Sequence, residues 1–152
     1  MNIQTIFIIT FGFLTNVLFS QTINWADLNN KWDCVKVIEL KGKDSVDTKQ
    51  FLPSSNIYSE DLNYKEEFPE SHMTTVGKYK IDKKNKKISF INLVCTATFK
   101  HGKKPQPDYV FNSGRQTLVV VKLNSQTLVM LQKGTPNTET PFDLVFFYKK
   151  SK

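Results

Sequence analysis

The amino-acid sequence predicts one all-β domain, either a sandwich or a barrel. Apolar residues alternate with polar residues over about eight short stretches after Gln21, which is the periodicity of strands with one buried face. Turn residues separate these stretches at hairpin spacing. The chain has 152 residues, a length that suits one domain, and it shows no internal repeat or low-complexity tract.

The first twenty residues differ from the rest of the chain. They contain no charged side chain, and 6–13 is strongly apolar. A membrane span needs about 20 mainly apolar residues, and Thr and Asn interrupt this stretch. The pattern predicts a signal peptide over 1–20 and a mature domain over 21–152, exported to the periplasm or the extracellular space. An uncleaved N-terminal anchor is the alternative interpretation.

The mature chain is expected to begin with a short helical turn followed by a long strand. Asn24 can cap a turn over 24–29, and the alternation over 32–40 predicts a strand. One predicted face of that strand carries Trp32, Cys34, Ile38 and Leu40, and the other carries Asp33, Val35, Val37 and Glu39.

The next region, 41–72, has a weaker pattern. Two short strands are expected near 56–58 and 64–68. Several acids gather here, and their spacing differs from that of a calcium-binding loop. We therefore interpret the following acids as part of a solvated loop: Glu60, Asp61, Glu66, Glu67 and Glu70.

The clearest hairpin covers 74–93. A four-residue turn at 83–86 sets Ile81 opposite Ile88 and Tyr79 opposite Phe90, so these side chains share one face. The same register sets Gly77 opposite Asn92. The lysines of both strands then lie on the other face, in water.

A second hairpin covers 116–132, with Asn124 and Ser125 as a two-residue loop that sets Val121 opposite Leu128. Both faces of this hairpin are apolar. It is therefore expected to be covered on both sides or to present an apolar outer patch. Further extended segments are expected over 94–99, 109–111 and 142–148.

The net charge is +7, and lysine supplies nearly all of the positive charge, because Arg115 is the only arginine. Lysine is a solvated point charge, whereas arginine is the preferred reader of phosphates and bases. No aromatic residue is interleaved with the basic loop 100–104, so nucleic acid is not an expected partner. The lysines either keep a β surface soluble or make peripheral contact with an anionic envelope surface.

The residues that could carry chemistry do not form a recognisable motif. The sequence lacks the zinc, nucleophile-elbow, phosphate-loop and dinucleotide patterns, so no metal, no cofactor and no catalytic residue is predicted. His72 and His101 are interpreted as loop residues, and the protein as a non-enzyme. Cys34 and Cys95 would form one disulfide in an oxidising compartment, or would be buried separately as small apolar residues.

Four segments in this order resemble a known family: 28–32 (LNNKW), 77–81 (GKYKI), 121–131 (VKLNSQTLVML) and 142–149. They resemble the lipocalin-like domains of small secreted proteins common in Bacteroidetes. The resemblance implies an antiparallel up-and-down barrel of about eight strands that binds a small apolar molecule. Asn30 stands at the place of the family's Gly, and Lys149 at the place of the Arg that packs on the Trp.

The aromatic and aliphatic face defines the candidate ligand-binding residues inside this barrel. They are Trp32, Tyr79, Ile81, Ile88, Phe90, Phe146 and Tyr148. The hypothesis is an exported lipocalin-like protein that binds a small hydrophobic molecule. The alternative is an interaction module with a filled barrel or sandwich, which acts through its basic or apolar surface at the cell envelope.

Overall fold

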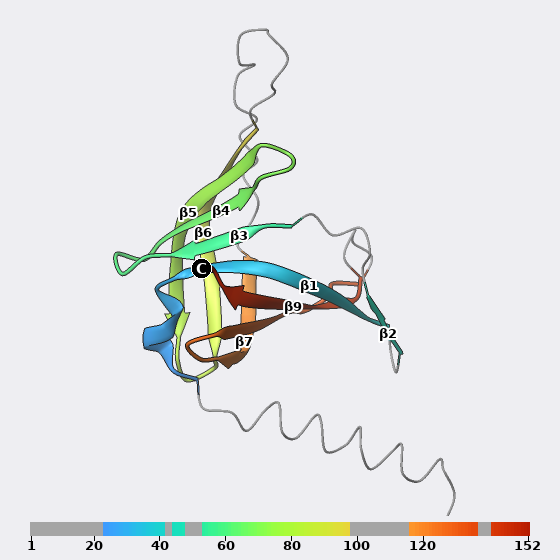
Figure 1. Ribbon diagram of the computed structural model, residues 1–152. Helices are drawn as coiled ribbons and strands as arrows, with labels where there is room; N and C mark the ends of the chain where they lie inside the picture. The colour runs from blue at the N-terminus through green and yellow to red at the C-terminus, as the bar shows by residue number, and fades with distance from the viewer. Residues whose placement is uncertain (1–22, 42–43, 48–52, 98–115, 137–140) are drawn as a thin grey trace, which may run out of the picture.

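The computed structural model describes residues 23–41, 44–47, 53–97, 116–136 and 141–152. These residues form one 3-10 turn and nine strands (Figure 1). The turn is η1 (Trp25–Leu28), and the strands are β1 (Lys31–Lys41), β2 (Asp44–Asp47), β3 (Ser55–Tyr58), β4 (Asn63–Phe68), β5 (Met73–Asp82), β6 (Lys87–Ala97), β7 (Gln116–Leu123), β8 (Thr127–Gln132) and β9 (Asp143–Lys150).

Eight of the strands form a closed antiparallel barrel. From β3 to β9 each strand pairs with the next strand along the chain, and β1 closes the barrel by pairing with β3 on one edge and β9 on the other. β2 pairs with the second half of β1, beyond the part that pairs with β3. The prediction of an up-and-down barrel of about eight strands with a short N-terminal helical turn is confirmed.

The turn η1 covers one end of the barrel, which we call the capped end. Asn24 caps η1 as expected, since its side chain accepts a hydrogen bond from the Ala26 amide. Leu28 and Trp32 are fully buried, and the Trp32 indole donates to the Leu28 carbonyl over 3.0 Å. The Asn24 amide also donates to the Leu123 carbonyl, so η1 is tied to β7 as well as to β1.

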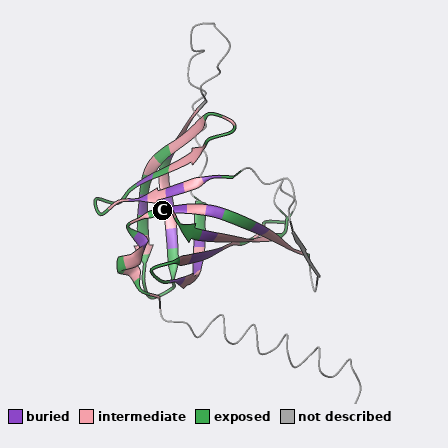
Figure 2. Ribbon diagram, viewed as in Figure 1, coloured by how far each residue is buried: buried purple, intermediate pink, exposed green. Residues whose placement is uncertain are grey.

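The opposite end, which we call the far end, contains the strand ends at Lys41, Phe68, Ala97 and Gln132. In Figure 1, β1 and β9 run toward the right and β4, β5 and β6 toward the top, so the strands diverge there. Figure 2 shows intermediate and exposed residues over the β4–β5 hairpin. Side-chain burial therefore falls from the capped end to the far end.

A β-bulge in β1 changes the faces predicted for this strand. Cys34 pairs with Tyr148, but Lys36 pairs with Phe147, so Val35 is an extra residue and is 49% exposed. One extra residue reverses which side chains point inward. Val37 is therefore buried with Trp32 and Cys34, and the predicted faces are wrong from Val37 onward: Val37 and Glu39 lie on the inner face, whereas Ile38 and Leu40 lie on the outer face.

The first hairpin has the predicted register near its turn. Ile81 pairs with Ile88, Tyr79 pairs with Phe90, and Asp82 pairs with Lys87. The expected pair of Gly77 and Asn92 is not formed, because a bulge shifts the register between Val76 and Lys78.

Gly77 is needed at this bulge. A Cβ atom on Gly77 would lie 2.8 Å from Leu93 Cδ2 and 2.9 Å from the Ile91 carbonyl oxygen, both too close. Asn92 takes the left-handed conformation, with φ of 53°. Gly77 therefore lets the two strands approach each other where β6 carries its extra residue.

The second hairpin is present, but its predicted register is wrong. Leu128 pairs with Leu123 instead of Val121, because the loop begins one residue later than expected. The Asn124 side chain accepts hydrogen bonds from the amides of Gln126 and Thr127, over 3.1 and 2.9 Å, and this fixes Asn124 as the first residue of the turn. A further bulge lies between Val120 and Lys122.

Candidate functional site

Aromatic side chains fill the middle of the barrel. The Tyr58 ring lies 5.4 Å from Tyr64, 5.3 Å from Tyr79 and 6.3 Å from Phe90, measured between ring centroids. Tyr64 and Phe90 are 4.5 Å apart. All four residues are buried, and Tyr148 is buried near them. The interior between the capped end and the middle of the barrel is therefore packed with side chains.

A row of polar residues crosses the inner face next to these aromatic residues. The strand registers pair Trp32 with Asn56, Asn56 with Glu66, Glu66 with Thr75, and Thr75 with Cys95. Directly paired residues share one face of a sheet, with Cβ atoms about 4.5–5.5 Å apart. Trp32 and Asn56 are buried, so this row points into the barrel. We call Asn56, Glu66, Thr75 and Cys95 the inner polar row.

Asn56 is the most buried member of this row, with 2% of its surface exposed. Its amide nitrogen donates to the Tyr148 hydroxyl over 3.3 Å, and it also stabilises the oxygen of Tyr58. The Tyr58 hydroxyl in turn donates to the Met130 sulfur over 3.8 Å. The Asn56 Oδ1 atom is buried and has no hydrogen-bond partner. An acceptor in this state is unfavourable by about 1–3 kcal/mol, so it marks a place where a donor would bind.

Glu66 brings a carboxylate into the barrel. Burial raises its pKa above the usual 4.5, while hydrogen bonds from the Ser54 and Tyr64 hydroxyls lower it in part. Its charge also raises the pKa values of Tyr58, Tyr64 and Tyr148, which places it among these rings. The interpretation of Glu66 as a solvated-loop residue is therefore wrong.

Glu67, the next residue, lies on the other face of β4. Its carboxylate forms ion pairs with Lys65 over 2.6 Å and with Lys31 over 3.3 Å. The hydrogen bond from Lys65 is the main cause that lowers the Glu67 pKa. Glu60, Asp61 and Glu70 are exposed, as a solvated loop requires.

Apolar residues continue along the inner face toward the far end. In β9, Tyr148, Phe146 and Leu144 alternate on this face, and Phe146 pairs with the buried residues Val37 and Met130. Phe146 and Leu144 are only partly buried. The far half of the interior thus offers apolar surface that is less well covered than that of the capped half, and Leu144 is flanked there by its pairing partners Glu39 and Gln132.

The predicted ligand-binding residues do lie together in one interior. Trp32, Tyr79, Ile88, Phe90 and Tyr148 are buried core residues, and Ile81 and Phe146 are partly buried against them. Sequence reasoning missed Asn56, Tyr58, Tyr64 and Glu66. The alternation of Asn56 with Tyr58 and of Tyr64 with Glu66 indicates that each pair shares one face of its strand, but the sequence does not show that this face points inward.

The two cysteines are separate thiols, so the predicted disulfide is absent from the structure. Cys34 is buried on β1, and Cys95 lies on β6. The strand order places β1 and β6 on opposite sides of the barrel. Burial raises the pKa of the Cys34 thiol to about 12, which makes it unreactive at neutral pH. The alternative interpretation, two cysteines buried separately, holds for Cys34, whereas Cys95 is only partly buried.

Lys149 does not meet Trp32. Lys149 pairs with Asp33, and Trp32 pairs with Lys150, so Lys149 lies on the opposite face of the sheet from the indole. The expectation that Lys149 replaces the family's Arg over the Trp is therefore wrong.

The remaining candidates for chemistry give no site. His72 is exposed in the turn between β4 and β5, and His101 lies outside the described residues, as do the expected signal peptide and the segment 109–111. No group of three or more His, Cys, Asp or Glu residues that could hold a metal ion occurs in the described part of the chain. Within the same residues, no helix has the length and hydropathy needed to cross a membrane.

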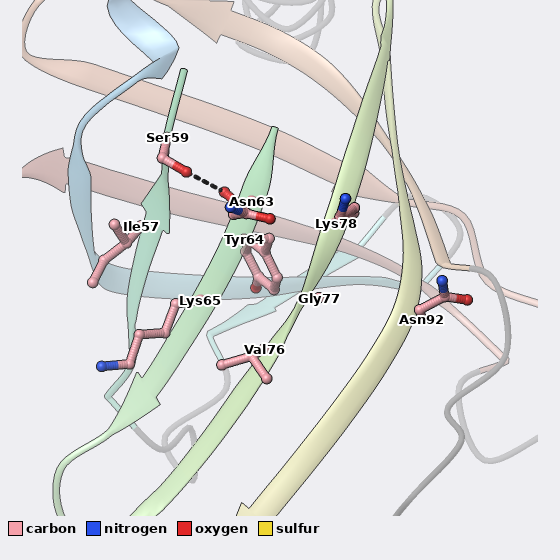
Figure 3. Close-up of a pocket in the computed structure, with 9 residues that line it drawn as sticks. All are labelled: Ile57, Ser59, Asn63, Tyr64, Lys65, Val76, Gly77, Lys78 and Asn92. Atoms are coloured by element: carbon pink, nitrogen blue, oxygen red, sulfur yellow. Dashed lines mark hydrogen bonds between the residues drawn. The ribbon is translucent and has the colours of Figure 1, made fainter. Parts of the chain in front are cut away.

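An open groove of about 470 Å³ lies on the outer face of β3, β4 and β5 (Figure 3). Ile57, Lys65 and Val76 line it from one side, and Val76 is 43% exposed. The groove is separate from the interior, since the register places these side chains on the outer face.

The comparison with solved structures agrees with this geometry. The chain is similar to a crystal structure of a mutant of LTBP1 in complex with leukotriene C4, with a TM-score of 0.51 and 13% sequence identity. The match covers 87% of this chain and 75% of that one. This chain has a lipocalin-like fold. No family model and no curated protein matches the sequence of this lipocalin-like barrel.

Proposed function

We propose that this protein is an exported, non-enzymatic carrier that holds a small apolar molecule in the far half of its lipocalin-like barrel. The observation that carries the proposal is the partly covered apolar face of β9, where Phe146 and Leu144 continue the inner face beyond the packed aromatic residues. Barrels of eight strands hold one small ligand when side chains leave part of the interior unfilled. The structural neighbour with bound leukotriene C4 supports this type of ligand.

The proposal of export depends on the sequence. The uncharged, apolar segment 1–20 is followed by Ser20 and Gln21, a junction typical of signal cleavage. Sequencing the N-terminus of the protein secreted by an expressing bacterium tests this directly. A mature N-terminus at Gln21 is the expected result, and a protein that keeps residues 1–20 contradicts it.

The carrier function can be tested with two neighbouring substitutions. Leu144 points inward, while Val145 pairs with Ile38 and Leu131 on the outer face. Leu144→Trp fills the far half of the interior and should weaken the binding of an environment-sensitive apolar dye by about tenfold. Val145→Trp adds the same bulk outside and should leave the dye affinity within about twofold.

Fluorescence titration of the full chain gives both affinities, and native mass spectrometry identifies any co-purified molecule. A wild-type protein that binds no dye and carries no molecule contradicts the carrier function. Equal losses from Leu144→Trp and Val145→Trp also contradict it, because binding would then not depend on the interior.

The outer groove favours a second candidate function, an interaction module that works through its surface. Lys65 and Lys78 lie beside Ile57 and Val76 there, so the groove combines basic and apolar groups (Figure 3). Such a surface suits peripheral contact with an anionic envelope component. Binding to anionic vesicles that is lost in Lys65→Glu, together with no dye binding by the interior, would favour this function over the carrier.

A further inference from the structure

We infer that the inner polar row recognises a protonated amine, so that the ligand of this barrel is an apolar molecule with an ammonium head group. This inference rests on the proposed carrier function and adds the chemical class of the ligand. Three properties of the row lead to it: an acceptor without a donor, a carboxylate in the interior, and tyrosine hydroxyls close to both.

The unpaired acceptor is Asn56 Oδ1. The amide of Asn56 is held in its orientation, because its nitrogen faces the hydroxyls of Tyr148 and Tyr58. The oxygen therefore points away from these hydroxyls and has no partner, although Asn56 is 2% exposed. A ligand that binds here must donate a hydrogen bond.

The carboxylate is that of Glu66, which pairs with Asn56 across β3 and β4 and so lies within about 4.5–5.5 Å of it between Cβ atoms. Among the described residues, burial raises the Glu66 pKa, the Ser54 and Tyr64 hydroxyls lower it in part, and no lysine contributes. An ionised carboxylate away from water is unfavourable unless a positive group compensates it. A ligand cation would supply the missing charge.

The tyrosine hydroxyls favour the same ligand. Tyr58, Tyr64 and Tyr148 lie close enough to Glu66 that its charge affects all three phenols. An ammonium group carries three donors, so it can also donate to a phenol oxygen beside Glu66 and Asn56. An alcohol could donate to Asn56 but would leave Glu66 uncompensated, and a fatty acid would bring a second negative charge next to Glu66.

The test compares three ligands with the same apolar tail: octylamine, octanol and octanoate. Calorimetric titration of the full wild-type chain at neutral pH should show octylamine binding at least about tenfold more tightly than either of the others, the size expected for a charge-assisted hydrogen bond. Glu66→Gln should reduce this preference by about tenfold while octanol affinity stays unchanged. Glu67→Gln, on the outer face, is the matched control and should keep the preference.

Octanol or octanoate binding as tightly as octylamine would overturn the inference and leave the carrier function standing. An unchanged amine preference in Glu66→Gln would also overturn it, since the head group would then lie elsewhere. Asn56→Leu gives a second variant, which should weaken octylamine binding more than octanol binding, because the hydrogen bond from an ammonium group to Asn56 Oδ1 is charge-assisted. Failure of all three ligands and of the apolar dye to bind would overturn the carrier function together with the inference.

Discussion

The two ends of the barrel differ in how well they bury their inward side chains. At the capped end, Leu28 of η1 packs with Trp32, and both side chains are fully buried. The Trp32 indole N–H donates a hydrogen bond to the Leu28 carbonyl. At the far end, Leu144 and Phe146 are on the same inner face but are only partly buried. The difference teaches that one end of this barrel buries its inward side chains fully, which stabilises the fold, and that the other end leaves apolar surface partly uncovered, where the proposed ligand would bind.

Loss of the largest buried side chain should have the largest effect on stability. Trp32→Ala should lower the free energy of unfolding by about 3–5 kcal/mol, because it leaves a cavity and removes the hydrogen bond to Leu28. Phe146→Ala, at the far end, should have about half this effect, since the ring is already partly exposed. Urea unfolding followed by far-ultraviolet circular dichroism measures both. Equal losses in the free energy of unfolding for the two variants would contradict the difference in burial between the two ends.

An intermediate effect is expected at Gly77, on the inner face between the two ends. Gly77→Ala should destabilise by about 1–3 kcal/mol, because the new methyl group meets the Leu93 side chain and the Ile91 carbonyl at less than 3 Å. Val76→Ala, at the exposed neighbouring position, should change stability by no more than about 0.5 kcal/mol. Thermal unfolding of both variants provides the comparison. Unchanged stability of Gly77→Ala would show that the backbone of the β6 bulge shifts without cost to make room for the methyl group.

The smallest effect concerns the pH dependence of stability, and it separates the inner face from the outer face of β4. The pKa of Glu66 is higher in the folded protein than in the unfolded chain. Glu66 therefore contributes fully to the free energy of unfolding below its unfolded pKa, near 4.5, and this contribution is lost as the pH rises through its folded pKa. Glu66→Gln should therefore gain stability relative to wild type as the pH rises from about 4 to 7.

Glu67→Gln should behave in the opposite way. The lysine partners of Glu67 lower its pKa in the folded protein. Its contribution to the free energy of unfolding is therefore present above its unfolded pKa, near 4.5, and is lost as the pH falls through its folded pKa. Relative to wild type, this variant should lose stability as the pH rises over the same interval. The measurement is the difference in urea midpoint between each variant and wild type at several pH values. The same sign for both variants would contradict the placement of these adjacent glutamates on opposite faces.

The comparison of the two glutamates also shows where sequence reasoning reached its limit. The strand near 64–68 was predicted and is present as β4. Its sequence, however, carries Glu66 and Glu67 side by side, so composition gives no reason to turn one inward and the other outward. The choice is made by pairing with β3 and β5, which places Tyr64 and therefore Glu66 on the inner face.

The sequence by itself determined the strands other than β2, the N-terminal turn and the register near the first hairpin turn, because alternation with a period of two and local turn residues are properties of short segments. Only the tertiary structure decided the bulges at Val35, Asn92 and Val121 and the inward position of Glu66. A bulge depends on how two strands pair along their whole length, and a shift of one residue exchanges the inner and outer faces. The inner polar row therefore exists only once the barrel has closed.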